Sequence, residues 1–289
     1  MISAGEVHLP GRPKDIVGLK ALAVVAAKAY ANLRPAGVKV HGGAPILELG
    51  MIEEDFAEMA KHGVKLVGEI GLGSVKTGKD AAPMVRWAKK HGMTVTIHTG
   101  GPSIAGSNPI SAEVVLEADP HVVGHINGGT TSMSEREIDS LVATQMALEI
   151  VHCGNGKTAL HTLARATDAQ ALHRIIIGND APSGTGVVPL GILRVIAHLA
   201  SLGGASPEAA ICMATGNTAR VYNLPVGVIE TGREADLCIV DAPVGSRGQD
   251  GPRSACARAI SSGSRWCSSM DRSGSGAAGT PRPRPGRPR

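Results

Sequence analysis

Aromatic side chains are scarce in this chain of 289 residues, at 2% of the sequence. Proteins that bind single-stranded nucleic acid stack its bases on aromatic side chains, so this shortage argues against that class. No run approaches the ~20 apolar residues that a membrane-spanning helix needs, which argues against a membrane protein. Hydrophobic residues nevertheless make up 43% of the chain, which is enough to form a core.

Cysteine motifs and targeting signals are also missing. The five Cys are scattered and form neither an even-numbered disulfide framework nor a Cys-x-x-Cys metal motif. The first residues lack the charged start and the apolar stretch of a secretory signal peptide. We therefore expect a protein of the reducing cytoplasm.

The net charge of +4 comes from one end of the chain. Residues 245–289 contain nine Arg and two Asp, whereas residues 1–244 contain 20 Lys and Arg against 23 Asp and Glu. The Arg-, Ser-, Gly- and Pro-rich end has little apolar surface to bury, so we predict that it is disordered. Its abrupt start after a strand-like pattern is typical of a shifted reading frame.

Short β-branched runs alternate with helical stretches through the rest of the chain. This alternation predicts a parallel sheet built from βα units. The predicted strands begin every 26–30 residues, at Val38–Val40, Val64–Ile70, Thr94–His98, His121–His125, Leu148–His152 and Arg174–Gly178. The predicted helices between them are Asp15–Ala31, Glu53–Lys61, Asp80–Lys90 and Ser134–Ser140, with another that has Ser206 as its N-cap.

The number of units leaves two α/β architectures open. Five or six strands would suit a doubly wound sheet, but no Gly-x-Gly-x-x-Gly turn opens any unit. The even period favours a TIM-type (β/α)8 barrel, with a strand fragment at Met1–Ala4. One strand of that barrel is then missing, and we expect the loss to lie upstream of Met1.

Polar side chains end the predicted strands on the side where barrel enzymes carry their active sites. Glu69 lies at the end of one strand, His98, His125 and His152 end the next three, and Asp180 follows the last. Imidazoles and carboxylates are ligands of zinc, iron and manganese. Neighbouring parallel strands lie ~4.8 Å apart, so these ends can converge on one or two ions. We predict Glu69, His98, His125 and Asp180 as metal ligands and His152 as a residue that faces substrate.

Two further features leave a metal-free alternative open. The segment Ser183–Gly186 precedes a helix and could cradle a phosphate, although it lacks a Walker lysine. Lys39 alternates with Val38 and Val40 and could project inward to form a Schiff base. Together they would suit a barrel lyase or isomerase that acts on a phosphorylated substrate.

The segments around the predicted ligands carry a family resemblance. They read Gly37-Val-Lys-Val-His-Gly-Gly43, Val67-Gly-Glu-Ile-Gly-Leu-Gly73, His98-Thr-Gly-Gly101, Gly124-His-Ile-Asn-Gly-Gly129, Gly178-Asn-Asp-Ala-Pro-Ser-Gly-Thr-Gly186 and Cys212-Met-Ala-Thr-Gly-Asn217. Gly227-Val-Ile-Glu-Thr-Gly-Arg-Glu-Ala-Asp-Leu237 follows them. Over residues 1–244 the sequence resembles the amidohydrolase superfamily, and more closely its enamidase branch. The last motif resembles the strand that returns to the superfamily's small β-sandwich.

The resemblance implies hydrolysis of the C–N bond of a cyclic amide, as in nicotinate degradation. It implies two metal ions, zinc or iron, with Glu69 between them and with His98 and His125 on one ion. It places Asp180 on the other ion, as general base and acid toward a bridging hydroxide. A small-molecule cyclic amide is the implied substrate and a homotetramer the implied assembly, with no membrane or nucleic-acid partner.

The sequence departs from the superfamily in one motif. No His-x-His pair occurs in the chain, although the family carries one on its first barrel strand. We therefore expect an incomplete hydrolase barrel over residues 1–225, a sandwich remnant over 226–244 and a disordered tail over 245–289. One ion is expected to remain, and activity to be impaired. In a third alternative the chain is a non-catalytic fragment that binds through its tail or an open sheet edge.

Overall fold

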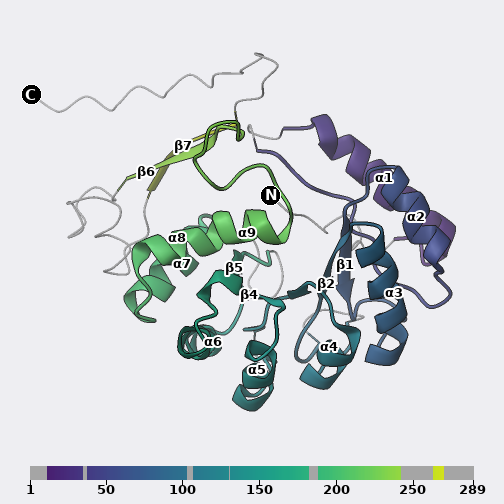
Figure 1. Ribbon diagram of the computed structural model, residues 1–289, viewed down its shortest axis with the longest axis horizontal. Coiled ribbons are helices and arrows are strands. Elements are labelled where there is room, and N and C mark those ends of the chain that lie inside the picture. The colour runs from purple at the N-terminus through teal and green to yellow at the C-terminus, as the bar shows by residue number, and fades with distance from the viewer. Residues whose placement is uncertain are drawn as a thin grey trace, which may run out of the picture.

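A five-stranded parallel sheet forms the centre of the computed structural model (Figure 1). The structure describes residues 12–34, 38–102, 107–129, 131–181 and 188–241, and the backbone of 263–269. Each strand pairs with the next one along the chain, as consecutive βα units predict. The strands are β1 (Leu66–Ile70), β2 (Thr94–Ile97), β3 (Val122–Val123), β4 (Ala147–Val151) and β5 (Ile175–Gly178).

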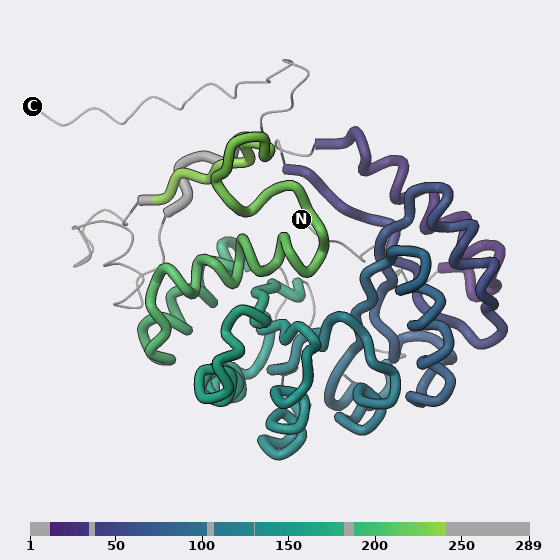
Figure 2. The backbone as a smooth tube through the Cα atoms, viewed as in Figure 1, coloured from purple at the N-terminus to yellow at the C-terminus, as the bar shows by residue number. Residues whose placement is uncertain are grey.

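Helices follow the strands and lie around the outside of the sheet, so that successive units go round it in chain order (Figure 2). The predicted TIM-type α/β order is confirmed, and in the described part of the chain β1 and β5 are edge strands, so the sheet is not closed there. The helices are α1 (Ile16–Asn32), α2 (Glu53–Lys61), α3 (Gly78–Lys90), α4 (Ala112–Ala118), α5 (Glu135–Val142), α6 (Gly156–Asp168), α7 (Gly191–Ser201), α8 (Pro207–Ala214) and α9 (Gly216–Val221), and the 3₁₀ turn η3 (Leu172–Arg174) leads into β5.

The two faces of the sheet pack against different partners because side chains alternate along a strand. The outer face joins the main core beneath the helices, through Val67, Val95, Ile97, Val123, Leu148, Ile150, Ile175 and Ile177. The inner face is smaller. There Val122, Ala147 and Ile176 pack against Val221 and Tyr222, at the end of α9. The C-terminal end of α9 therefore covers part of the inner face.

One predicted strand is wrong. Residues 38–40 form no strand, and only His41 makes an isolated bridge. The edge of β1 pairs with a different segment, since the Gly68 N–H donates to the Pro45 carbonyl (2.9 Å). The strand fragment at Met1–Ala4 and the segment Ser183–Gly186 lie outside the described residues.

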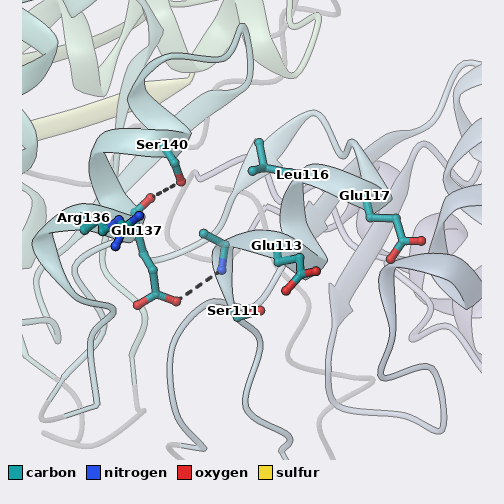
Figure 3. A pocket seen from close by; sticks show the side chains of 8 residues that line it. Ser111, Glu113, Leu116, Glu117, Arg136, Glu137 and Ser140 are labelled. Carbon is teal, nitrogen blue, oxygen red and sulfur yellow. Dashed lines mark hydrogen bonds between the residues drawn. The ribbon is translucent and has the colours of Figure 1, made fainter.

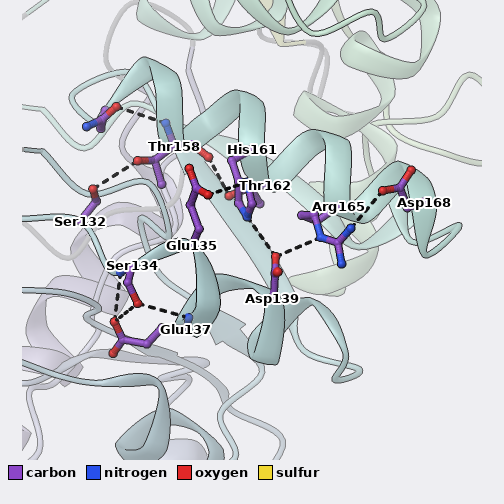
Figure 4. A network of polar contacts seen from close by, with 11 residues as sticks. Ser132, Ser134, Glu135, Glu137, Asp139, Thr158, His161, Thr162, Arg165 and Asp168 are labelled. Carbon is purple, nitrogen blue, oxygen red and sulfur yellow. Dashed lines mark hydrogen bonds and ion pairs between the residues drawn. The ribbon is translucent and has the colours of Figure 1, made fainter.

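Helix boundaries follow the predicted capping residues. Ser134 and Glu137 form the capping box of α5, and Ser206 caps α8 with Pro207 as its first residue. Helix α5 is tied to α6 by a polar network (Figure 4). Its centre is Asp139, whose carboxylate accepts hydrogen bonds from His161 (2.9 Å) and from Arg165 (3.0 Å).

The chain ends its described part in an antiparallel pair, β6 (Asp236–Asp241) and β7 (Gly263–Ser269). Strand β7 lies within residues 245–289, for which composition predicted disorder, and the prediction does not hold for these seven residues. Antiparallel backbone pairing with β6 makes these residues a strand, although their composition does not favour one. Across the described ranges, no helix has the length and apolar character to cross a membrane.

Candidate metal centre

Three of the four predicted ligands lie together at the carboxyl ends of neighbouring strands. Glu69 is on β1, His98 follows β2, and His125 follows β3. One ligand atom from each lies within 4.8 Å of the others, and the two imidazole rings meet edge to face with centroids 4.6 Å apart. The sequence predicted this convergence from the strand ends alone.

The hydrogen bonds of His98 fix which ring nitrogen faces the centre. His98 Nε2 lies 3.1 Å from the Gly101 carbonyl, which can only accept, so Nε2 carries the proton. Burial, followed by the charge of His125, lowers the pKa of His98 to about 4, so its ring is neutral at pH 7. The lone pair is therefore on Nδ1, which lies 2.9 Å from His125 Nε2. Gly71 leaves room for this ring, because a Cβ there would lie 3.1 Å from the His98 Cβ.

His125 carries the opposite charge state in the metal-free protein. Burial alone lowers its pKa, but the hydrogen bond and the charge of Glu69 raise that pKa to about 9. Its Nε2 lies 3.4 Å from the Glu69 carboxylate. The residue has a positive φ of 31°, which is strained for a side chain with a Cβ. Its buried Nδ1 has no hydrogen-bond partner among the described residues.

Asp180 follows β5 and lies near this group without joining it. Its charge acts on the pKa of His125, yet it is not among the residues whose ligand atoms lie within 4.8 Å of one another. Burial raises the pKa of Asp180 to about 6, against the opposing effect of the His125 charge. A carboxyl group with that pKa can both accept and donate a proton near neutral pH.

Two residues that the sequence did not single out support the centre. Glu149 points from β4 to the turn that carries His125, and burial raises the pKa of Glu149 to about 7. Asn127 is 1% exposed and bonds to both the N–H and the carbonyl of Val151. A charged residue in the middle of an apolar strand was the signal that could have identified Glu149.

The remaining sequence candidates lie elsewhere. His152 lines a cavity of about 240 Å³ with Arg194 and His198, and is not part of the three-residue group. The Lys39 amine forms ion pairs with Glu234 and with Asp236 (2.9 Å). Burial alone lowers the pKa of Lys39, but these carboxylates raise it above its ordinary value. A Schiff-base lysine must lose its proton, so Lys39 is poorly suited to that role.

A larger groove, of about 870 Å³, lies between α4 and α5 (Figure 3). Its lining includes Glu113, Glu117 and Arg136, and none of the predicted ligands. Glu137 bridges the two helices there, by accepting a hydrogen bond from the Ala112 N–H (3.5 Å). The groove is therefore separate from the metal centre.

The donor set of Glu69, His98 and His125 fits one divalent ion. Metal-binding histidines usually donate their second N–H to a carbonyl or carboxylate, as His98 does to Gly101. Two imidazoles and one carboxylate are a three-residue ligand set of a catalytic zinc site. Within the described ranges no second group of three such residues was found.

The chain is similar to several known proteins. Residues 52–261 match the sequence profile of the Amidohydrolase family. The chain is 57% identical over 251 residues, 86% of its length, to enamidase of Eubacterium barkeri, and it spans 65% of that enzyme's length. The crystal structure of enamidase superposes with a TM-score of 0.89 at 54% identity, over 93% of this chain and 70% of that one. A β-aspartyl dipeptidase of Fervidobacterium islandicum shares the fold alone, with a TM-score of 0.53 at 18% identity over 78% of this chain and 64% of that one. The chain belongs to the amidohydrolase family.

Proposed function

We propose that this chain is a metal-dependent hydrolase that cleaves the C–N bond of a cyclic amide. The observation that carries the proposal is the convergence of Glu69, His98 and His125 within 4.8 Å at the carboxyl edge of the sheet. The similarity to enamidase supports the substrate class. Zinc or iron suits this donor set, and a divalent ion bound there would supply a hydroxide at neutral pH and polarise the amide carbonyl.

The residues around the centre divide the remaining chemistry between them. His98 offers Nδ1 as a neutral donor, since its Nε2–H is held by the Gly101 carbonyl. His125 would hold the ion through Nε2, and it would have to release from that atom the proton that Glu69 stabilises. Asp180 takes a proton from the attacking water and returns it to the leaving nitrogen, which its pKa of about 6 permits. We assign Asp180 as the catalytic acid and base.

The proposal also covers the metal content, location, assembly and parts of the chain. One ion per chain is expected, because the described residues hold one three-ligand group. A cytoplasmic location is proposed from the five scattered Cys, which suit a reducing compartment, and assembly into a homo-oligomer by analogy with the enamidase branch. The proposed division of the chain is a hydrolase barrel over residues 1–225, a β-sandwich segment over 226–244 and a tail over 245–289.

Metal analysis of His98→Ala and His125→Ala tests the proposal. The chain as it stands, supplied with zinc or iron, should bind about one ion, and each variant should lose it. Asp180→Asn should keep the ion and lose hydrolysis of a cyclic amide. Full metal content in both histidine variants, with an unchanged circular dichroism spectrum, would contradict the ligand assignment. A folded chain that binds no ion would instead favour a non-catalytic role.

A further inference from the structure

We propose that Glu149 is a positioning residue for His125, acting through the backbone of the turn that carries this ligand. The inference rests on the proposed function, because it takes His125 as a metal ligand. It concerns a carboxylate that is not a ligand itself.

The turn at residues 124–127 leaves the sheet immediately before the centre. Strands β3 and β4 pair in register only at Val122 and Val123. The chain then turns, and His125 takes its positive φ of 31°. A strained residue of this kind persists only where its surroundings hold it in place.

Strand β4 holds the turn with contacts that replace a regular ladder. The Glu149 carboxylate accepts a hydrogen bond from the His125 N–H (3.2 Å), and the Glu149 carbonyl accepts one from the Ile126 N–H (2.9 Å). The Asn127 side chain then bonds to the Val151 N–H (2.8 Å) and carbonyl (3.0 Å). Three successive turn residues are therefore anchored on β4, and only His125 depends on a side chain of the strand.

The Glu149 carboxylate is itself confined. Gly178 on β5 gives it room, because a Cβ at that position would lie 2.5 Å from Glu149 Oε1. On the inner face Tyr222 lies close enough that, after burial, the charge of Glu149 raises the pKa of Tyr222. A carboxylate with so little freedom can fix the peptide to which it bonds, and with it the direction of the imidazole.

Zinc titration against a chromophoric chelator tests the inference on the full chain. Glu149→Gln keeps an oxygen acceptor for the His125 N–H, whereas Glu149→Leu has a similar volume and no acceptor. The glutamine variant should bind zinc within about threefold of the original chain, and the leucine variant about 10–100-fold more weakly. Gly178→Ala should weaken binding as well, because it displaces the carboxylate without altering Glu149.

Glu48→Leu is a matched control, since Glu48 also accepts a backbone N–H, that of Ser74 (2.7 Å), outside the three-ligand group. It should leave zinc affinity unchanged. The inference would be overturned if Glu149→Leu bound zinc as tightly as the original chain. It would also be overturned if Glu149→Gln and Glu149→Leu weakened zinc binding equally, because the charge of Glu149 and not its acceptor oxygen would then matter. Failure of the original chain to bind either zinc or iron would overturn the proposed function. In that case the amide ¹H shift of His125 in zinc-free protein still tests the contact, since only the leucine variant should move it upfield.

Discussion

Replacing Asn127 should destabilise the protein more than the loss of any surface amide, because its buried carboxamide makes three hydrogen bonds. The amide group donates to the carbonyls of Val151 (3.0 Å) and Asn155 (3.3 Å), and its oxygen accepts from the Val151 N–H (2.8 Å). Each such bond contributes about 1 kcal/mol, and a buried group left without a partner costs about 1–3 kcal/mol. We therefore expect Asn127→Ala to lower the free energy of unfolding by about 3–5 kcal/mol.

Urea denaturation followed by circular dichroism measures this loss, with Asn108→Ala as the comparison. The Asn108 side chain donates to the Gly71 carbonyl (2.9 Å), but that carbonyl also accepts the Asn108 backbone N–H (2.8 Å). The control should thus cost about 1 kcal/mol. Asn127→Asp keeps the acceptor yet turns an oxygen toward two carbonyls, so its cost should shrink when acid protonates it. A loss below about 1 kcal/mol for Asn127→Ala would refute the argument that side-chain bonds hold this turn.

Three further predictions concern charge. The raised pKa of His125 means that the folded, metal-free protein keeps a proton that the unfolded chain loses above pH 6.5. The free energy of unfolding should therefore fall from pH 6.5 to about 9, by at most ~1.4 kcal/mol per pH unit. Urea titrations at each pH should show a weaker pH dependence of this free energy for Glu69→Gln. Arg174 is buried and donates hydrogen bonds to the carbonyls of Met146 (2.9 Å) and Val142 (2.5 Å). Arg174→Met should therefore lower the free energy of unfolding by about 2–4 kcal/mol, and an unaltered thermal unfolding temperature would contradict this. Lys39→Met should keep the bound metal and lower the free energy of unfolding by at most ~1 kcal/mol. In the original chain, borohydride should trap no adduct between Lys39 and a carbonyl compound.

One regularity of the sequence predicted the sheet and the grouping of the three proposed metal ligands. Glu69, His98 and His125 each lie at the end of an apolar run and two or three residues before a glycine, so they could be placed at one edge before any distance was known. Residues 38–40 were wrongly predicted as a strand, because an alternating run of three residues does not show which segment pairs with the edge of a sheet. At the edge of β1 the Pro45 carbonyl accepts the hydrogen bond instead. The role of Glu149 was not predictable, because it depends on the backbone of a turn contributed by another unit. Strand β7 was missed because pairing, not composition, makes it a strand.

The sequential strand order also bears on how the protein opens. Glu69, His98 and His125 come from three consecutive units, so an ion bound to them would join β1, β2 and β3 and leave β5 without a ligand in that group. Ligand binding to the native state adds stability only against openings that break the site. Amide hydrogens of β1 to β3 should then exchange more slowly when metal is bound, while those of α7 and α8 keep their rates. Strand β4 lies between these regions. Its hydrogen bonds to residues 125–127 should decide how far the protection from exchange extends toward β5.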